Sequence, residues 1–323
     1  MERPELRKIV LMDVVSDELV DAIRAVVPDV NLVARSDESE VAEEIVDAQV
    51  LIGDHISIAN LERAEQLFWH HRPWVGVEKI LNPMYVEKGV IMTNGSGTNS
   101  ANIAEHVIGM MLAFAREFPR FFRDKAEKRW RSWDAGDKTI FDLEGQRVLC
   151  LGTGAIGQEV ARRLVAFGCE MVGASRSGNE APGFLRTVAI DDMGDELSEA
   201  DSIVNCLPMT PTTDKIVSRE MIARMKKGSR FYNVGRGGTV DQDALIEALQ
   251  SGHIAAAGLD VMTPEPLNPD SPLWEMDNVI ITSHTAGDSP RSHQRMKDLV
   301  VEQIRRYQAG EQLMNIVDVS AGY

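Results

Sequence analysis

The sequence predicts an α/β protein with two doubly wound domains, each built on a parallel sheet. Short apolar runs alternate with amphipathic stretches, as strands and helices do around such a sheet. The alternation occupies the N-terminal part of the chain and begins again, more completely, at Arg147. The 323 residues suffice for two domains of ordinary size, and 44% hydrophobic residues can fill two cores.

The N-terminal part is expected to form the smaller domain. Ser16 is placed to cap a helix that carries Leu19, Ile23 and Val26 at helical spacing. An acidic helix is expected over Glu38–Asp47. Strands are expected at Ile9–Met12, Val30–Ala34, Val50–Ile52 and Val90–Met92.

A long helix is expected to follow, with Ser100 as its cap and Ile103, Val107, Met110 and Phe114 at helical spacing. Because this run is apolar on nearly all sides, we expect it to be buried between domains.

The second domain is expected to have six strands. Ser218 and Asp241 are placed as helix caps, and Gly228 and Gly252 lie just beyond helix ends. A last helix is expected over 289–310. The expected strands are Arg147–Leu151, Met171–Ala174, Ser202–Cys206, Arg230–Val234, Ala255–Leu259 and Val279–Thr282.

The charge balance argues against nucleic acid and anionic membranes as partners. Lys and Arg number 34 against 50 Asp and Glu, a net charge of −16. No apolar run is long enough for a membrane span, and the N-terminus lacks a signal-peptide layout, so we expect a cytoplasmic protein. The basic-aromatic segment Phe118–Trp133 is short, and we favour an arm that packs on a partner subunit.

Metal ligands and disulfides are not expected. The three cysteines, Cys150, Cys169 and Cys206, lie in or beside apolar runs and have no CxxC spacing. The histidines lack the spacing of a metal site, and His70 and His71 are adjacent residues whose side chains diverge.

A glycine-rich turn predicts a dinucleotide site. Gly152, Gly154 and Gly157 form a GxGxxG directly after a strand and at the start of a helix. Glycines in these places allow a tight turn, a close approach of the pyrophosphate and close packing of helix on strand. A plain strand–helix turn is the less favoured interpretation.

The next strand ends in Ser175-Arg176, where an NAD site would carry Asp or Glu. An arginine flanked by hydroxyl groups would bind the 2′-phosphate of NADP by charge-assisted hydrogen bonds. The sequence therefore favours NADP(H) over NAD(H). The alternative is that Arg176 stacks on the adenine of either cofactor.

Three polar residues, Arg236, Glu265 and His284, each follow an apolar strand-like run. Ligand sites of open α/β sheets lie at the carboxyl ends of strands, so the three are expected to meet in one cleft. His284 suits proton transfer to a carbonyl oxygen, and Glu265 could orient its ring. Arg236 could clamp a substrate carboxylate and polarise the carbonyl, and Asp260 could bind the nicotinamide carboxamide.

Several motifs in order resemble the D-isomer-specific 2-hydroxyacid dehydrogenase family over nearly the whole chain. Glu265 favours the hydroxyacid branch, since formate dehydrogenases carry glutamine there, and Ser175-Arg176 resembles the NADP-preferring glyoxylate/hydroxypyruvate reductases. The motifs are Asn99-Ser100 with Ala104-Glu105-His106, Leu207–Pro211, Asn233–Asp241 with Ala244-Leu245, Asp260–Pro266 and His284–Gly287.

The resemblance implies a flavodoxin-like substrate domain, residues 1–102 and 288–323, and an inserted Rossmann nucleotide-binding domain, residues 103–287. The active site would lie between the two domains, and subunits would pair as a homodimer through the nucleotide-binding domains. Backbone N–H groups of Val75, Gly76 and Val77 would bind the substrate carboxylate. The cofactor would be lined by Ser100, Ala155, Ile156, Val234 and Asp260.

The chain departs from its relatives near Trp74, whose bulky side chain, together with the cationic Arg72, could reshape the substrate pocket. The leading interpretation is reduction of a small 2-oxo acid to a D-2-hydroxy acid with NADPH. The alternatives are NAD-dependent oxidation of a larger D-2-hydroxy acid and a non-enzymatic, dinucleotide-sensing corepressor-like protein.

Overall fold

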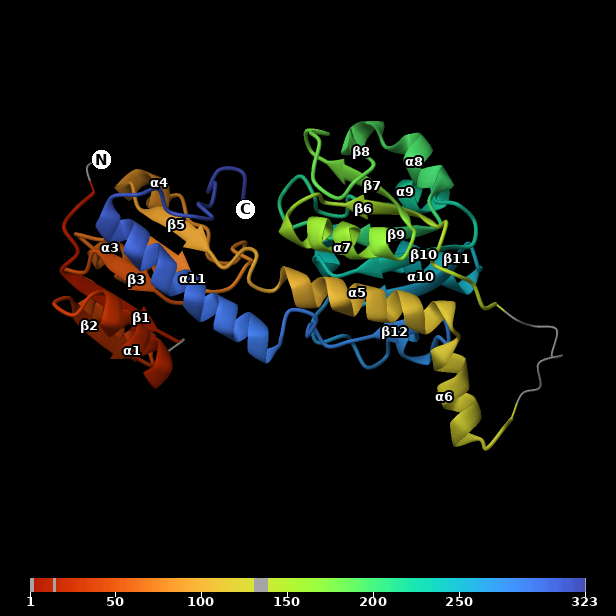
Figure 1. Ribbon diagram of the computed structural model, residues 1–323, viewed down its shortest axis with the longest axis horizontal. Helices are drawn as coiled ribbons and strands as arrows, with labels where there is room; N and C mark the ends of the chain where they lie inside the picture. The colour runs from red at the N-terminus through yellow and green to blue at the C-terminus, as the bar shows by residue number, and fades with distance from the viewer. Residues whose placement is uncertain (1–2, 14–15, 131–138, 323) are drawn as a thin grey trace. The chain divides into compact units, whose positions relative to one another are not determined.

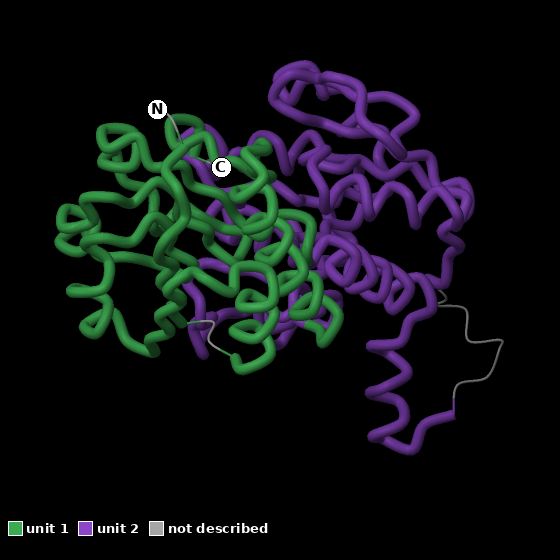
Figure 2. Tube along the Cα trace, turned by 60° about the vertical axis from the view of Figure 1, so that its left-hand side comes forward, with its two compact units in different colours: residues 1–98, 289–323 green, residues 99–288 purple. Residues whose placement is uncertain are grey.

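The computed structural model describes residues 3–13, 16–130 and 139–322 and divides into two compact units (Figures 1 and 2). Unit 1 comprises Met1–Thr98 together with Ser289–Tyr323, and unit 2 is the continuous segment Asn99–Asp288. The sequence placed these limits after Asn102 and before Asp288. Both sheets are parallel, which confirms the predicted fold class.

Unit 1 has a five-stranded sheet in the order β2-β1-β3-β4-β5, which is the flavodoxin-like order. Its strands are β1 (Lys8–Met12), β2 (Asn31–Arg35), β3 (Val50–Ile52), β4 (Trp69–Arg72) and β5 (Ile91–Asn94). Its helices are α1 (Asp17–Val26), α2 (Val41–Glu44), α3 (Ile58–Arg63), α4 (Met84–Lys88) and α11 (Pro290–Ala309), with a 3-10 turn at Glu38–Glu40.

Alternate side chains of β1 enter two separate cores, as the period of a strand requires. Ile9 and Leu11 pack with side chains of α1 and α11. Val10 and Met12 pack with side chains of α2, α3 and α4. The sheet is therefore covered on both faces, and α11 brings the C-terminal segment into the N-terminal domain.

Unit 2 has a seven-stranded sheet in the order β12-β11-β10-β9-β6-β7-β8, so the strand order reverses between β6 and β9. Its strands are β6 (Arg147–Leu151), β7 (Glu170–Ser175), β8 (Arg186–Ala189), β9 (Ser202–Asn205), β10 (Ser229–Asn233), β11 (Ile254–Leu259) and β12 (Val279–Ile281). Its helices are α5 (Ser100–Ala115), α6 (Phe118–Ala126), α7 (Ala155–Ala166), α8 (Gly194–Glu199), α9 (Arg219–Arg224) and α10 (Gln242–Gln250), with 3-10 turns at Ile190–Asp192, Gly237–Thr239 and Pro272–Glu275.

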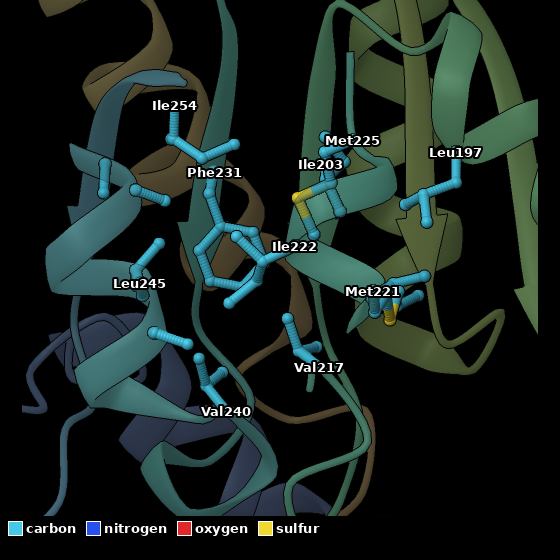
Figure 3. Close-up of a cluster of buried hydrophobic side chains, with 14 of the residues drawn as sticks. Leu197, Ile203, Val217, Met221, Ile222, Met225, Phe231, Val240, Leu245 and Ile254 are labelled. Atoms are coloured by element: carbon cyan, nitrogen blue, oxygen red, sulfur yellow. The ribbon is translucent and has the colours of Figure 1, made fainter. Parts of the chain in front are cut away.

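Two hydrophobic clusters cover the faces of this sheet. One joins Phe231 of β10 to Leu197 of α8, Ile222 of α9 and Leu245 of α10 (Figure 3). The other joins the sheet to α5 and α7, which pack along each other. The two clusters make the second sheet a rigid support for the loops at its strand ends.

Four details differ from the sequence predictions. Asn99, rather than Ser100, precedes α5 as its N-cap, and Ser100 is the first helical residue. The edge strand β8 was not predicted, because it is short, has no buried residue and starts with the exposed Arg186. The strand β4 was also missed, and residues 118–126 form a helix within the expected arm. Trp133 lies outside the described residues.

Across residues 3–13, 16–130 and 139–322, no helix has both the length and the apolar character that crossing a membrane requires.

Candidate active site

The turn after β6 has the backbone that its glycines predict. Gly152 has a φ of 100°, in the left-handed region. A Cβ atom on Gly152 would lie 3.2 Å from the carbonyl oxygen of Cys206, just past β9, where the strand order reverses. A Cβ atom on Gly157 would lie 2.1 Å from the carbonyl oxygen of Gly152, so only glycine lets α7 begin this close to β6.

The N-terminus of α7 is open toward a ligand. Its N-cap Gly154 offers no side-chain hydrogen bond, and an added Cβ there would meet no atom within 4 Å. The free N–H groups and the helix dipole favour an anion at this place. Gly152, Gly154, Ala155, Ile156 and Gly157 thus form a turn that fits the pyrophosphate of a dinucleotide.

The end of β7 presents a hydroxyl group and a guanidinium. Ser175 is the last residue of the strand, and its Oγ accepts a hydrogen bond of 3.1 Å from the N–H of Gly178. Arg176 follows and is exposed. No carboxylate occupies the strand end, so nothing there would repel a phosphate on the adenosine ribose.

Glu265 and His284 are brought together by the loops after β11 and β12. The His284 Nδ1 and Glu265 Oε2 atoms are 2.8 Å apart. The other carboxylate oxygen, Oε1, accepts a hydrogen bond of 3.0 Å from the N–H of Met262. Glu265 thus holds the ring through Nδ1, while His284 Nε2 has no hydrogen-bond partner among the described residues. A ring held in this way is suited to proton exchange with a ligand.

The backbone of His284 is in the left-handed region, with a φ of 55°, and Asp260 fixes the loop around it. The carbonyl oxygen of Asp260 accepts from the N–H of His284 at 2.9 Å. Its buried carboxylate accepts from Thr282 Oγ1 at 2.6 Å, from the Thr285 N–H at 3.0 Å and from the Ala286 N–H at 3.1 Å. The sequence assigned Asp260 to the cofactor alone and missed this contact with the histidine loop.

Arg236 follows β10 between two glycines that lie against neighbouring backbone. Its Nη1 donates to the carbonyl oxygen of Gly235 at 2.9 Å. A Cβ on Gly237 would lie 1.9 Å from the carbonyl oxygen of Met262, whose N–H binds Glu265. The loop of Arg236 therefore packs directly on the loop that orients the histidine.

Two further predicted cofactor residues lie in the same unit. Ser100 is buried at the start of α5, and within the described part of the chain its Oγ has no hydrogen-bond partner. Val234 is buried, and its N–H donates to the carbonyl oxygen of Asn205 at 3.1 Å. The sequence placed His106 in a family motif but did not predict its contact with Thr282, because the two residues are far apart along the chain. The His106 Nε2 atom lies 3.0 Å from Thr282 Oγ1.

Val75, Gly76 and Val77 lie in unit 1, directly after β4. Val77 is buried in the core, and Val75 and Gly76 are half-buried. Arg72, at the end of β4, donates from Nε and Nη2 to Asp54 Oδ1 at 2.8 Å and 2.7 Å. Its guanidinium is thus already paired with a carboxylate, while the Trp74 side chain is 44% exposed.

Within the residues described above, no group of three or more His, Cys, Asp or Glu side chains is arranged so that it could hold a metal ion.

Comparison with known proteins identifies the chain's relatives. The D-3-phosphoglycerate dehydrogenase of Methanocaldococcus jannaschii is 34% identical over 316 residues, which is 97% of this chain and 59% of that protein. The chain thus spans only about three fifths of that relative. A D-isomer specific 2-hydroxyacid dehydrogenase from Xanthobacter autotrophicus, solved with NADPH and MES, has a TM-score of 0.85 and 30% identity and covers 99% of this chain and 100% of its own.

A second similar structure is the NADPH-dependent glyoxylate/hydroxypyruvate reductase of Sinorhizobium meliloti with NADP and sulfate, at a TM-score of 0.83, 26% identity and coverage of 99% of this chain and 100% of its own. Residues 108–286 match the model of the D-isomer specific 2-hydroxyacid dehydrogenase NAD binding domain. The resemblance found in the sequence is confirmed, and the chain belongs to the D-isomer specific 2-hydroxyacid dehydrogenase family.

Proposed function

We propose that this protein reversibly reduces a small 2-oxo acid to a D-2-hydroxy acid with NADPH. The observation that carries the proposal is the hydrogen bond between His284 and Glu265, in the same unit as a turn that fits a dinucleotide. A histidine oriented by a carboxylate is the arrangement that proton transfer to a carbonyl oxygen needs.

In this proposal, bound NADPH supplies the hydride to the carbonyl carbon. His284 donates the proton from Nε2 to the carbonyl oxygen, and in the reverse direction it takes the proton from the hydroxyl group. Glu265, on the far ring nitrogen, keeps the ring oriented and stabilises its protonated form. Arg236 holds the substrate carboxylate and polarises the carbonyl, and the N–H groups of residues 75–77 bind the same carboxylate.

The preference for NADP(H) is supported by the end of β7, where Ser175 and Arg176 replace the carboxylate of an NAD site. Both similar structures described above contain NADPH or NADP. The relatives also support a small 2-oxo acid such as glyoxylate or hydroxypyruvate as the substrate class. Arg72 also supports a small substrate. Its guanidinium is already paired with Asp54, so it does not offer a binding partner for the second anionic group of a larger substrate.

The activity is tested by the absorbance of reduced nicotinamide with glyoxylate, hydroxypyruvate and pyruvate. We expect NADPH oxidation with at least one of them, and a fall of two to four powers of ten in kcat for His284→Ala. NADPH binding should survive, since His284 is not in the dinucleotide turn. His253→Ala is the matched control, because His253 lies in the same unit and its Nε2 is 3.0 Å from the carbonyl oxygen of Ile222, away from Glu265 and His284.

The outcomes separate the alternatives. Turnover only with NAD and a larger D-2-hydroxy acid would favour the oxidation that the sequence left open. NADPH binding without turnover of any acid would favour the dinucleotide-sensing protein.

We also propose that the protein is a homodimer that pairs through unit 2. Three phenylalanines of α6 (Phe118, Phe121 and Phe122) are exposed, although aromatic side chains of this size are usually covered. In both views of the chain, α6 extends away from the remainder of unit 2 (Figures 1 and 2).

A further inference from the structure

The last residue of β5, Asn94, and the following residue, Gly95, hold the loop that follows β4. The N–H of Gly95 donates to the carbonyl oxygen of Trp74 at 3.1 Å. The Asn94 Nδ2 atom donates to the carbonyl oxygen of Val75 at 2.8 Å. A Cβ atom on Gly95 would lie 1.9 Å from the carbonyl oxygen of Pro73, so the two segments are in the closest contact that a glycine allows.

Asn94 is itself held in a single orientation. It is 8% exposed, and its Oδ1 accepts from the N–H of Ser96 at 3.1 Å, which places the amide nitrogen toward Val75. The C-terminal segment adds three hydrogen bonds. The N–H of Asn94 donates to the carbonyl oxygen of Asn315 at 3.1 Å, and Asn315 Nδ2 donates to the carbonyl oxygens of Asn94 and Ser96 at 3.2 Å and 2.8 Å. At position 94, only a side chain with both a donor and an acceptor can bond the carbonyl oxygen of Val75 and the N–H of Ser96.

The hydrogen bonds to the carbonyl oxygens of Trp74 and Val75 determine where the N–H groups of the following residues point. In a trans peptide unit, the carbonyl oxygen and the N–H point in opposite directions. With the carbonyl oxygens of Trp74 and Val75 held toward β5, the N–H groups of Val75 and Gly76 point away from it. Neither of these N–H groups has a hydrogen-bond acceptor among the described residues of the chain. Consecutive N–H groups presented in this way form an anion-binding concavity.

We infer that Asn94 is a positioning residue for substrate binding: through the carbonyl oxygen of Val75 it aims the N–H of Gly76 at the substrate carboxylate. The inference rests on the proposed function, which assigns that carboxylate to residues 75–77. Asn94 touches no reacting atom. Its effect is on binding of the ground state and the transition state alike, so its loss should raise KM and leave kcat nearly unchanged.

The test is steady-state kinetics with NADPH and hydroxypyruvate. Asn94→Asp keeps the shape and the acceptor of the side chain but has no donor for Val75, and Asn94→Ala removes both. Both variants are expected to raise KM, and the inhibition constant of the carboxylate analogue oxamate, by about tenfold, the factor that corresponds to one lost hydrogen bond of about 1.4 kcal/mol. The kcat and the dissociation constant of NADPH should change by less than about twofold.

Asn82→Ala is the matched control, because Asn82 Oδ1 accepts only from the N–H of Met84 at the start of α4, in the same unit. It should lower stability without moving KM. Unchanged KM and oxamate inhibition in both Asn94 variants would overturn the inference, as would an equal rise of KM in Asn82→Ala.

A second pair of variants separates this inference from the proposed function. Gly76→Pro removes the N–H itself, whereas Gly76→Ala keeps it. If Gly76→Pro raises KM and the Asn94 variants do not, the loop binds the carboxylate but Asn94 does not position it. If a folded Gly76→Pro that binds NADPH also leaves KM unchanged, the assignment of residues 75–77 is wrong, and the inference falls with it.

Discussion

His284 owes its position to residues that do no proton chemistry themselves. Its backbone is in the left-handed region, which costs free energy for a residue with a Cβ, and Asp260 offsets this cost by hydrogen bonds to its N–H and to the loop around it. Asp260 can bind a loop strongly because its carboxylate is buried, where its hydrogen bonds do not compete with water. In the proposed function His284 transfers the proton, and its position thus depends on Asp260 as much as on Glu265.

A single residue, Arg176, is expected to determine the choice between NADPH and NADH. We expect Arg176→Ala to raise the dissociation constant of NADPH by about 10- to 100-fold, because it removes charge-assisted hydrogen bonds worth about 1.5–3 kcal/mol to the 2′-phosphate. NADH binding should stay within about twofold. The measurement is fluorescence titration with both cofactors.

Arg186→Ala is the control for this prediction, because Arg186 lies on the neighbouring strand β8 and is paired with Glu196 at 2.8 Å. An equal loss of NADPH and NADH affinity in Arg176→Ala would favour adenine stacking. It would remove the basis for a preference for NADP(H).

The sequence predicted the glycine turn and the pairing of Glu265 with His284, but not the contacts that surround them. The places of Gly152 and Gly157 after a strand have a steric cause, and the contacts around both residues confirm it, whereas Gly154 has open space beside it. The hydrogen bond of Glu265 to His284 could be expected because both residues follow strands and so lie at the same edge of a parallel sheet. The bonds of Asp260 to Thr285 and of Asn94 to Val75 could not, because they depend on loop conformations with no local sequence signature.

At the level of elements, β4 shows where periodicity fails as a guide. It lies inside the first sheet, between β3 and β5, yet His70 and His71 give it a polar appearance in the sequence. Both rings are fully buried and hydrogen-bonded: His70 Nδ1 to the hydroxyl of Tyr85 at 2.7 Å, and His71 Nδ1 to the hydroxyl of Thr93 at 2.8 Å. A parallel strand covered on both faces can thus contain histidine where the rings find partners.

Burial of these rings makes the stability of unit 1 sensitive to acid. It lowers the pKa of His70 from 6.5 to about 4 and that of His71 from 6.5 to about 3. Between these values and about pH 6.5 the unfolded chain binds more protons than the folded one, so stability is fully present above about pH 6.5 and is lost as the pH falls toward 4. We expect the midpoint temperature of unfolding to fall over this range.

His71→Asn tests this prediction, because asparagine keeps hydrogen-bonding capacity without a titrating ring. Whatever its stability at pH 7.5, the variant should lose less stability than the natural chain between pH 6.5 and 4.5, as followed by circular dichroism. An unaltered slope in His71→Asn would show that other groups cause the acid sensitivity.

For the whole molecule, the sequence predicted two doubly wound sheets because each strand–helix alternation carries its own signal. The path of the chain is harder to predict, because the core of unit 1 is completed by α11, which lies near the other end of the sequence. Met296, Val300 and Ile304 of α11 are buried against Leu19 and Ile23 of α1. Helical periodicity in residues 289–310 was visible beforehand, but its partner was not, since an apolar stripe does not specify what covers it.

The exposed phenylalanines of α6 make the proposed pairing of two chains testable. Phe122 is 68% exposed, and covering a phenylalanine contributes about 1.5–3 kcal/mol to an interface. A second apolar surface of unit 2 is the groove of about 420 Å³ between α5 and α7, lined in part by Ile108, Leu112 and Phe167. A pair of chains that covers both surfaces would bury more apolar area than either surface alone, as a stable interface needs.

We therefore expect the protein, whose single chain is 35.7 kDa, to sediment at about twice that mass. Phe122→Glu should shift it toward the mass of one chain, because the interface would bury an unpaired charge. Val86→Glu is the control: Val86 is 66% exposed, on α4 of unit 1, and should leave the mass unchanged. Sedimentation of the natural chain at the mass of one subunit at micromolar concentration, or equal dissociation of both variants, would contradict pairing through α6.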